Sequence, residues 1–194
     1  MTPTRALTRT LFLAAVMFVT VAQGFAAPSA GSQPREVIAL AKQIAALSDT
    51  IRPEEARQAA ACAVETSVDL ARTYQVAGPP QVHNFLVNIG VKKRGLCHHW
   101  ARDLIQRLRA LKLRSFDLHW GAARAGTLRE HNAVILTAKR QPFVSGIVLD
   151  PWRHSGRLFS GPVATDRYPW KEDLTDCFCS RTRGVATRHA LRRR

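Results

Sequence analysis

Residues 95–111 read GLCHHWARDLIQRLRAL, and this stretch decides how the rest of the chain is interpreted. Its apolar residues recur at the spacing of one helix face, which predicts an amphipathic helix from His98 to Leu111. Gly95 permits a tight turn before the helix, so Cys97 stands at the N-terminal edge. Unpaired N–H groups and the helix dipole favour negative charge there and promote ionisation of a thiol. The stretch therefore predicts a core helix headed by a candidate nucleophile.

Three further helices are predicted before this stretch. Apolar residues at helical spacing indicate the first over residues 35–47. The second begins at Pro53, has Glu54 and Glu55 in its first turn, and runs to about Tyr74. A short third helix is expected over residues 81–89, ended by a glycine.

The pattern changes from helical to extended after the Cys97 helix. Residues 115–120 and parts of residues 131–137 alternate between polar and apolar, and residues 144–149 form a third short β-like run. Helices followed by at least three strands predict an α+β fold, in which the long helix packs on a small antiparallel sheet.

A thiol nucleophile needs a base, and histidine suits this role near neutral pH. His131 begins a predicted core strand, and Asp150 closes the next apolar run. Neighbouring antiparallel strands can place the two side by side, where the carboxylate would fix the tautomer of the imidazole. We therefore expect Cys97, His131 and Asp150 to be the catalytic residues. His119, near the end of another strand, is the alternative base.

The same chemistry requires donors to a developing oxyanion. The backbone N–H of Cys97 is one natural donor. The sequence does not identify the second, although His83, Asn84 and Asn88 lie upstream of the turn and are candidates.

A metal site is the competing chemistry. His99 and Asp103 share a helix face, and His98, His119 and His131 could converge on them from elsewhere. The chain has no compact zinc signature such as H-E-x-x-H. We therefore expect neither a metal nor a cofactor.

Several of these segments resemble the transglutaminase-like branch of the papain-like cysteine enzymes, as in bacterial transglutaminase-like cysteine peptidases. They are residues 95–101 (GLCHHWA) with the leucine-rich helix that follows, His131 at the start of a strand, and residues 150–152 (DPW). In that superfamily a G-x-C-x-x-x-A type segment opens the central helix, and histidine and aspartate follow on successive strands. The similarity covers roughly residues 85–152.

The resemblance implies a triad of Cys97, His131 and Asp150, acyl-enzyme chemistry, and a central helix headed by the cysteine on a small antiparallel sheet. It indicates the type of reaction better than the substrate, because members include transamidases, peptidases and amidases. Two features depart from the pattern. Asn132 follows the histidine where an aromatic residue is often found, and residues 121–129 form a short glycine- and alanine-rich segment.

The N-terminus is typical of a secretory signal over residues 1–26. Arg5 and Arg9 supply a basic start, residues 11–22 form an apolar run too short to span a bilayer, and small residues precede Pro28. We expect export to the periplasm or the exterior; an uncleaved membrane anchor is the alternative.

Cleavage after residue 26 would leave a linker over residues 27–34, one domain over residues 35–179, and a basic tail over residues 180–194. The tail holds six arginines and few sizeable apolar residues, so we expect it to be disordered. It could bind a partner or simply be solvated.

Four cysteines enter an oxidising compartment after export. The simplest arrangement keeps Cys97 free and bridges Cys62 to either Cys177 or Cys179, which leaves one thiol over. Alternatively, all four are small buried apolar residues.

The formal net charge of the chain is +15, with 46% hydrophobic and 22% charged residues, as in a soluble globular protein. This charge favours a protein or peptide substrate that is acidic or associated with the cell envelope. The arginines are not interleaved with stacking aromatics, so we expect no dedicated nucleic-acid binding. The competing function is a non-catalytic basic binding module for anionic envelope polymers or proteins.

Overall fold

The computed structural model describes residues 33–174. The predicted signal segment (residues 1–26) and the predicted basic tail (residues 180–194) lie outside these residues, as do Cys177 and Cys179. No helix in the described part of the chain has the length and apolar character needed to cross a membrane.

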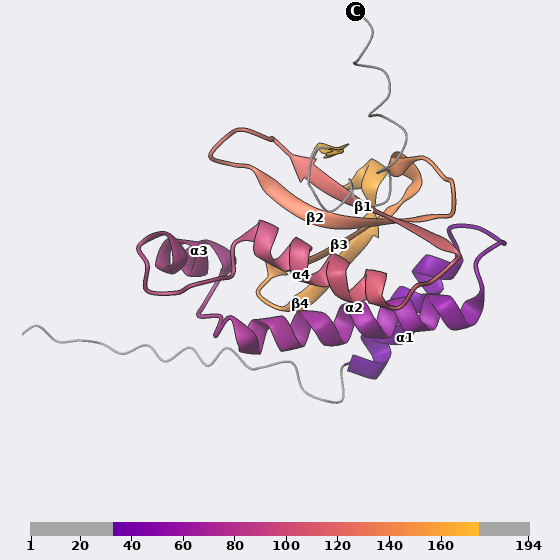
Figure 1. Cartoon of the computed structure of the whole chain (residues 1–194), viewed down its shortest axis with the longest axis horizontal. Helices are drawn as coiled ribbons and strands as arrows, with labels where there is room; N and C mark the ends of the chain where they lie inside the picture. Colours follow the sequence, from indigo (N-terminus) through magenta and orange to yellow (C-terminus); the bar gives the residue numbers. More distant parts are fainter. Residues whose placement is uncertain (1–32, 175–194) are drawn as a thin grey trace, which may run out of the picture.

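Residues 33–174 form four α-helices and one five-stranded antiparallel sheet, so the expected α+β class is confirmed (Figure 1). The helices are α1 (Gln33–Ala45), α2 (Pro53–Thr73), α3 (Pro80–Asn88) and α4 (Cys97–Ala110). The strands are β1 (Phe116–Ala123), β2 (His131–Ala138), β3 (Ile147–His154), β4 (Arg157–Pro162) and β5 (Trp170–Glu172), with 3₁₀ turns η1 (Phe143–Ser145) and η2 (Val163–Thr165).

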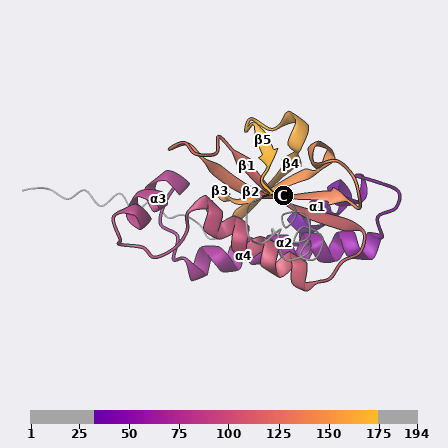
Figure 2. The ribbon, with the colours of Figure 1, turned by 45° about the horizontal axis from the view of Figure 1, so that its top comes forward.

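The strands are arranged in the order β4-β3-β2-β1-β5, so β2 lies at the centre of the sheet. Helices α4 and α2 lie along one face of the sheet, and α1 packs against α2 (Figure 2). Helix α3 lies apart from this layer, beside the start of α4, in both views (Figure 1). Two of the expected catalytic residues begin elements of this fold: Cys97 is the first residue of α4, and His131 is the first residue of β2.

The main core lies between α4 and the sheet. Leu104, Ile105 and Leu108 on α4 are almost fully buried against Val134 and Leu136 of β2. Burial of a leucine or isoleucine side chain contributes about 1.5–3 kcal/mol. Helix α2 packs beside α4 and contacts β4, and its alanine-rich face contributes small side chains that let neighbouring helices approach closely.

The opposite face of the sheet is also covered, which explains why all eight residues of β2 are buried. Ile135 and Val148 lie on that face beneath Trp170 of β5 and the partly buried Tyr168. A strand buried on both faces needs apolar residues at successive positions, and HNAVILTA provides them.

The third strand differs from the sequence-based expectation. It begins at Ile147 and not at Val144, because Val144 belongs to η1. It also continues through Pro151 to His154, because His154 pairs with Arg157 of β4. Pro151 lies where the ladder to β2 has stopped, at Leu149, and where the ladder to β4 shifts register after Asp150. A proline, which cannot donate to a ladder, is tolerated at such an irregularity.

Three other boundaries also differ. Helix α1 begins at Gln33, inside the expected linker, because a proline such as Pro34 is tolerated in the first turn of a helix. Strand β1 extends to Ala123, three residues beyond the expected end. Strands β4 and β5 were not expected.

Candidate active site

The turn before α4 is shaped by Gly95, whose φ of +126° favours glycine. A Cβ at this position would lie 2.2 Å from Nε2 of His83. His83 is buried, and its Nδ1 accepts from the Ala77 N–H at 3.2 Å. Its Nε2 therefore carries the hydrogen and donates to the Arg94 carbonyl at 2.9 Å. These contacts join α3 to the turn that leads into Cys97.

His99 binds the backbone at the start of α4. Its Nδ1 accepts from the N–H groups of Gly95 and Leu96, each at 3.2 Å. Burial, followed by the charge of His98, lowers the pKa of His99 to about 4. His99 is therefore a neutral acceptor at neutral pH, as these hydrogen bonds require. Trp100 donates from Nε1 to the Gly95 carbonyl at 2.8 Å and completes the anchoring of the turn.

His131 and Asp150 lie together because they share a face of the sheet. Ile135 pairs with Val148, and alternate residues along each strand point to the same side. Nε2 of His131 lies 2.6 Å from Oδ2 of Asp150. The two residues are 2% and 0% exposed.

This contact determines the state of the two ring nitrogens of His131. An ionised carboxylate only accepts, so Nε2 carries the hydrogen. Nδ1 is buried and has no hydrogen-bond partner among residues 33–174. In the neutral ring, Nδ1 is therefore an unused acceptor that can take a proton.

Cys97 is half-buried at the first position of α4. Its Sγ lies 3.7 Å from Oδ1 of Asn132 and 3.9 Å from the carbonyl oxygen of Glu130. Burial by itself would raise the pKa of this thiol. Interactions with His131 and His98 outweigh that effect and lower the pKa to about 7.

The pKa of His131 shifts in the opposite direction. Burial alone would lower it, but the contact with Asp150 and the interaction with Cys97 raise the pKa to about 9. Between about pH 7 and pH 9, the thiolate and the imidazolium are therefore the favoured forms. The two pKa shifts favour an anionic nucleophile together with a cationic acid.

Asp150 is held by a second partner, Arg153. The Nε of Arg153 donates to Oδ2 of Asp150 at 3.1 Å, and its backbone N–H donates to Oδ1 at 3.1 Å. Its two terminal nitrogens donate to the carboxylate of Asp166 at 3.0 and 2.7 Å. Trp170 also donates to Asp166, at 2.8 Å. This network connects β3, the residues after η2, and β5 behind the imidazole.

Three aromatic rings enclose His131. The centroids of Trp152, Tyr168 and Trp170 lie 4.6, 4.7 and 5.4 Å from that of the imidazole. Trp152 is fixed by its own Nε1–H, which donates to Oδ1 of Asn84 at 3.0 Å. The rings exclude water from the His131–Asp150 pair, which strengthens the interaction between charged groups.

His119, the alternative base, lies elsewhere on the sheet. It pairs with Ile135 in the middle of the β1–β2 ladder, whereas His131 pairs with Ala123 at the end of that ladder. Its Nδ1 contacts Glu172 at 2.7 Å and its Nε2 contacts Thr137 at 3.0 Å. Its two nitrogens join β1 to β5 and β2, and the structure does not bring it to Cys97.

The candidates for a second oxyanion donor differ in availability. Both nitrogens of His83 are used in the turn. The side-chain oxygen of Asn84 accepts from Trp152, so the amide of Asn84 is directed to that ring in the wall of the site. Asn88 is exposed at the end of α3. The first N–H groups of α4, including that of Cys97, have no intrahelical partner and remain the most direct donors.

The alternative metal ligands do not converge. Among residues 33–174, no three His, Cys, Asp or Glu side chains are grouped so as to hold a metal ion. His99 is turned to the backbone, and Asp103 accepts from the hydroxyl of Tyr74 at 2.7 Å and from Arg94 at 2.8 Å. Cys62 is a free thiol on α2 and belongs to no such group.

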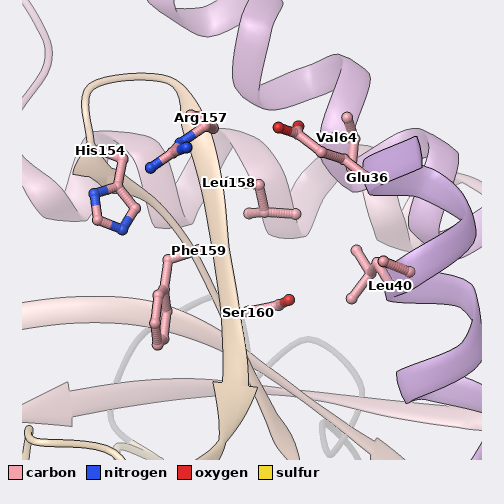
Figure 3. Close-up of a pocket in the computed structure, with 9 residues that line it drawn as sticks. Glu36, Leu40, Val64, His154, Arg157, Leu158, Phe159 and Ser160 are labelled. Carbon is pink, nitrogen blue, oxygen red and sulfur yellow. The ribbon is translucent and has the colours of Figure 1, made fainter. Parts of the chain in front are cut away.

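A separate pocket of about 250 Å³ lies between α1, α2 and β4 (Figure 3). Leu40, Val64 and Leu158 line it, and Glu36 and Arg157 stand at its margin (Figure 3). None of the three candidate catalytic residues lines this pocket.

The fold and the site define an α+β domain in which a half-buried cysteine heads a helix beside a buried His–Asp pair. Comparisons with protein-family models, with curated proteins and with solved structures find no match to this chain.

Sequence reasoning missed several residues of this site. Arg153 follows Asp150 closely along the chain, and a basic residue beside a buried acid was a usable signal. Asp166 and Trp170 carried none, since β5 was not expected. His99 was considered as a metal ligand, whereas its Nδ1 accepts from the backbone, because the neighbouring turn presents unpaired N–H groups to its ring.

Proposed function

We propose that this chain is an exported cysteine hydrolase or acyltransferase of the transglutaminase-like, papain-like class. The observation that carries the proposal is the state of His131. One of its nitrogens is bound to buried Asp150, the other is buried without a hydrogen-bond partner, and interaction with the Cys97 thiol helps to raise the pKa of the ring. The base, its orienting carboxylate and the nucleophile are then the three expected residues.

The reaction begins with attack of the Cys97 thiolate on the carbonyl carbon of an amide, which forms a C–S bond. Backbone N–H groups at the start of α4 stabilise the oxyanion. The C–N bond then breaks, and His131 transfers the proton on Nδ1 to the leaving amine. Water next attacks the thioester while Nδ1 takes a proton from it, and the C–S bond breaks to release the acid and restore the thiolate.

The order of the elements supports the papain-like core. A helix that begins at the nucleophile packs on the centre of an antiparallel sheet, and the histidine and aspartate come from successive strands, β2 and β3. Hydrolysis is the simpler outcome. An acyltransferase would use the same thioester with an amine in place of water. The substrate is a protein or peptide met after export.

The test is the rate at which iodoacetamide alkylates Cys97 as a function of pH, read by mass spectrometry on the peptide that contains it. The pKa of about 7 predicts a midpoint near pH 7 for the intact protein. In His131→Ala the first of the two lowering partners is gone, whereas His98 and burial remain, so the midpoint moves up from pH 7 towards about 8.5, the value of an ordinary thiol. Cys62, with its raised pKa, serves as an internal control.

Identical midpoints in the two proteins would contradict the proposal, as would a Cys97 that reacts only after unfolding. The chain would then be read as a non-catalytic basic binding module. Deletion of residues 180–194 separates the two functions further, because a binder that relies on its arginines loses affinity whereas the enzyme keeps its thiol chemistry.

A further inference from the structure

Helix α3 carries an exposed apolar face beside the candidate active site. Val82, Phe85 and Ile89 lie three and four residues apart, and Val91 follows just beyond the end of the helix. Their exposed fractions are 49%, 60%, 54% and 63%. These four side chains are called the α3 apolar face. Adjoining apolar side chains of this size on a surface indicate an interaction site.

The opposite side of α3 is attached to the groups that position the nucleophile and the base. His83 is buried against Gly95, the glycine that shapes the turn before Cys97. Asn84 accepts from the indole of Trp152, which packs on His131. A molecule bound to the α3 apolar face would therefore be connected, through α3, to the groups that position the thiol and the imidazole.

The charge around this face selects the kind of molecule that fits it. No aspartate or glutamate occurs between Asp69 and Asp103, and Lys92 and Lys93 directly follow the apolar face. Asp103 itself is paired with Arg94. The charge next to the apolar face is therefore positive, and it complements an acidic partner.

The β1–β2 hairpin carries a similar combination of side chains near the thiol. The carbonyl of Glu130 lies 3.9 Å from Sγ of Cys97, and the loop before it exposes Leu128 completely between Arg124 and Arg129. Glu130 is the acid of this loop, and its carboxylate is occupied by the Gly126 N–H. Apolar side chains with neighbouring cations thus occur on two elements close to Cys97.

We propose that the α3 apolar face is the substrate-docking surface, and that it takes a polypeptide whose apolar side chains are flanked by aspartate or glutamate. The inference rests on the proposed function and specifies its substrate class. A peptide substrate accounts for the connection of this helix, through His83 and Asn84, to Gly95 and Trp152. Docking to an anionic membrane would require an apolar face and cations but no connection to Trp152 and Gly95.

The experiment uses the full chain with Cys97→Ala, so that binding is measured without turnover. The probe is a short fluorescent peptide with Leu-Phe flanked on both sides by acids. One matched peptide replaces Leu-Phe by Ser-Ser, and another replaces the acids by lysines. We expect the first peptide to bind at least about tenfold more tightly than either of the others, by fluorescence anisotropy.

Two variants assign the binding to the surface. The double variant Phe85→Ser, Ile89→Ser should bind the acidic apolar peptide about tenfold or more weakly than the parent chain. The double variant Phe85→Leu, Ile89→Leu retains apolar area, and its affinity should stay within about threefold of the parent value. Val144→Ser is the matched control, because Val144 is 57% exposed on η1, away from α3. It should leave the affinity unchanged, and circular dichroism checks the fold of each variant.

Equal affinity for the three peptides, or no loss with the serine pair, would overturn the proposal. The proposal would also be overturned if the double serine variant lost binding only to phosphatidylglycerol vesicles, because the surface would then be a membrane contact. The alkylation profile of the intact protein separates the two hypotheses. An unactivated Cys97 together with selective peptide binding would refute the enzyme and keep the docking surface.

Discussion

Replacement of Arg153 by methionine removes the cation that two buried carboxylates share. The side chains of Asp150 and Asp166 are 0% and 2% exposed, and that of Arg153 is 5% exposed. The guanidinium makes one hydrogen bond to the first carboxylate and two to the second. Removal of one member of a buried ion pair costs about 3–5 kcal/mol, because the other member stays buried without compensation.

The loss should depend on pH in a defined direction. Burial alone would raise the pKa of Asp166, but hydrogen bonds from Arg153 and Trp170 lower it below its ordinary value. In the intact protein this group therefore stabilises the fold above its unfolded pKa of about 3.9, and the contribution disappears as the pH falls through the lower folded pKa. Without Arg153, burial raises the folded pKa of Asp166. Acidification then protonates Asp166, and the loss of stability in the variant becomes smaller.

The assay is urea unfolding of the intact protein and of Arg153→Met at pH 7 and pH 5. We expect a deficit of about 3–5 kcal/mol at pH 7 and a smaller deficit at pH 5. Addition of Asp166→Asn to this variant removes the buried carboxylate charge that Arg153 no longer compensates, and it should recover part of the lost stability. Arg157→Met, at an exposed arginine of β4, should cost less than about 0.5 kcal/mol. A deficit below about 1 kcal/mol, or one that does not change with pH, would refute the reasoning.

Two further substitutions test the turn and the alternative base. Gly95→Ala should cost more than about 2 kcal/mol in thermal or urea unfolding, since its φ is +126° and the new Cβ would lie 2.2 Å from His83. Gly90→Ala is its control, because its φ is also positive but nothing lies within 4 Å, and similar losses at both sites would argue against the steric cause. His119→Phe should cost about 1–3 kcal/mol by leaving the buried hydroxyl of Thr137 unpaired. It should leave the alkylation midpoint of Cys97 unchanged, and a shift would mean that His119 does act on the thiol.

The helices were the most predictable part of the fold. The start of α2 at Pro53 and the start of the core helix next to Cys97 agree closely with the structure. Both boundaries follow from local signals, namely a proline in the first turn and a glycine-containing turn before an apolar period. Such signals act within a few residues and need no information about distant segments.

The ends of the sheet were less predictable. Val144 continues an apolar run and was expected in a strand, yet it lies in η1. Strand β5 has only three residues, and it is held by Gly121, Ala122 and Ala123 at the end of β1. Short edge strands depend on a partner from a distant part of the chain, so the local pattern cannot distinguish them from loops.

The sequence by itself determined the α+β class and placed a cysteine at the start of a central helix, with His131 and Asp150 on successive strands. These features follow from hydrophobic period and chain order. Only the tertiary structure decided how His131 is used, with Nε2 on Asp150 and Nδ1 unpaired, and brought Arg153 and Asp166 behind the carboxylate. The reason is that strand register and packing between segments distant in the chain set these distances, and neither is encoded in any local stretch of residues.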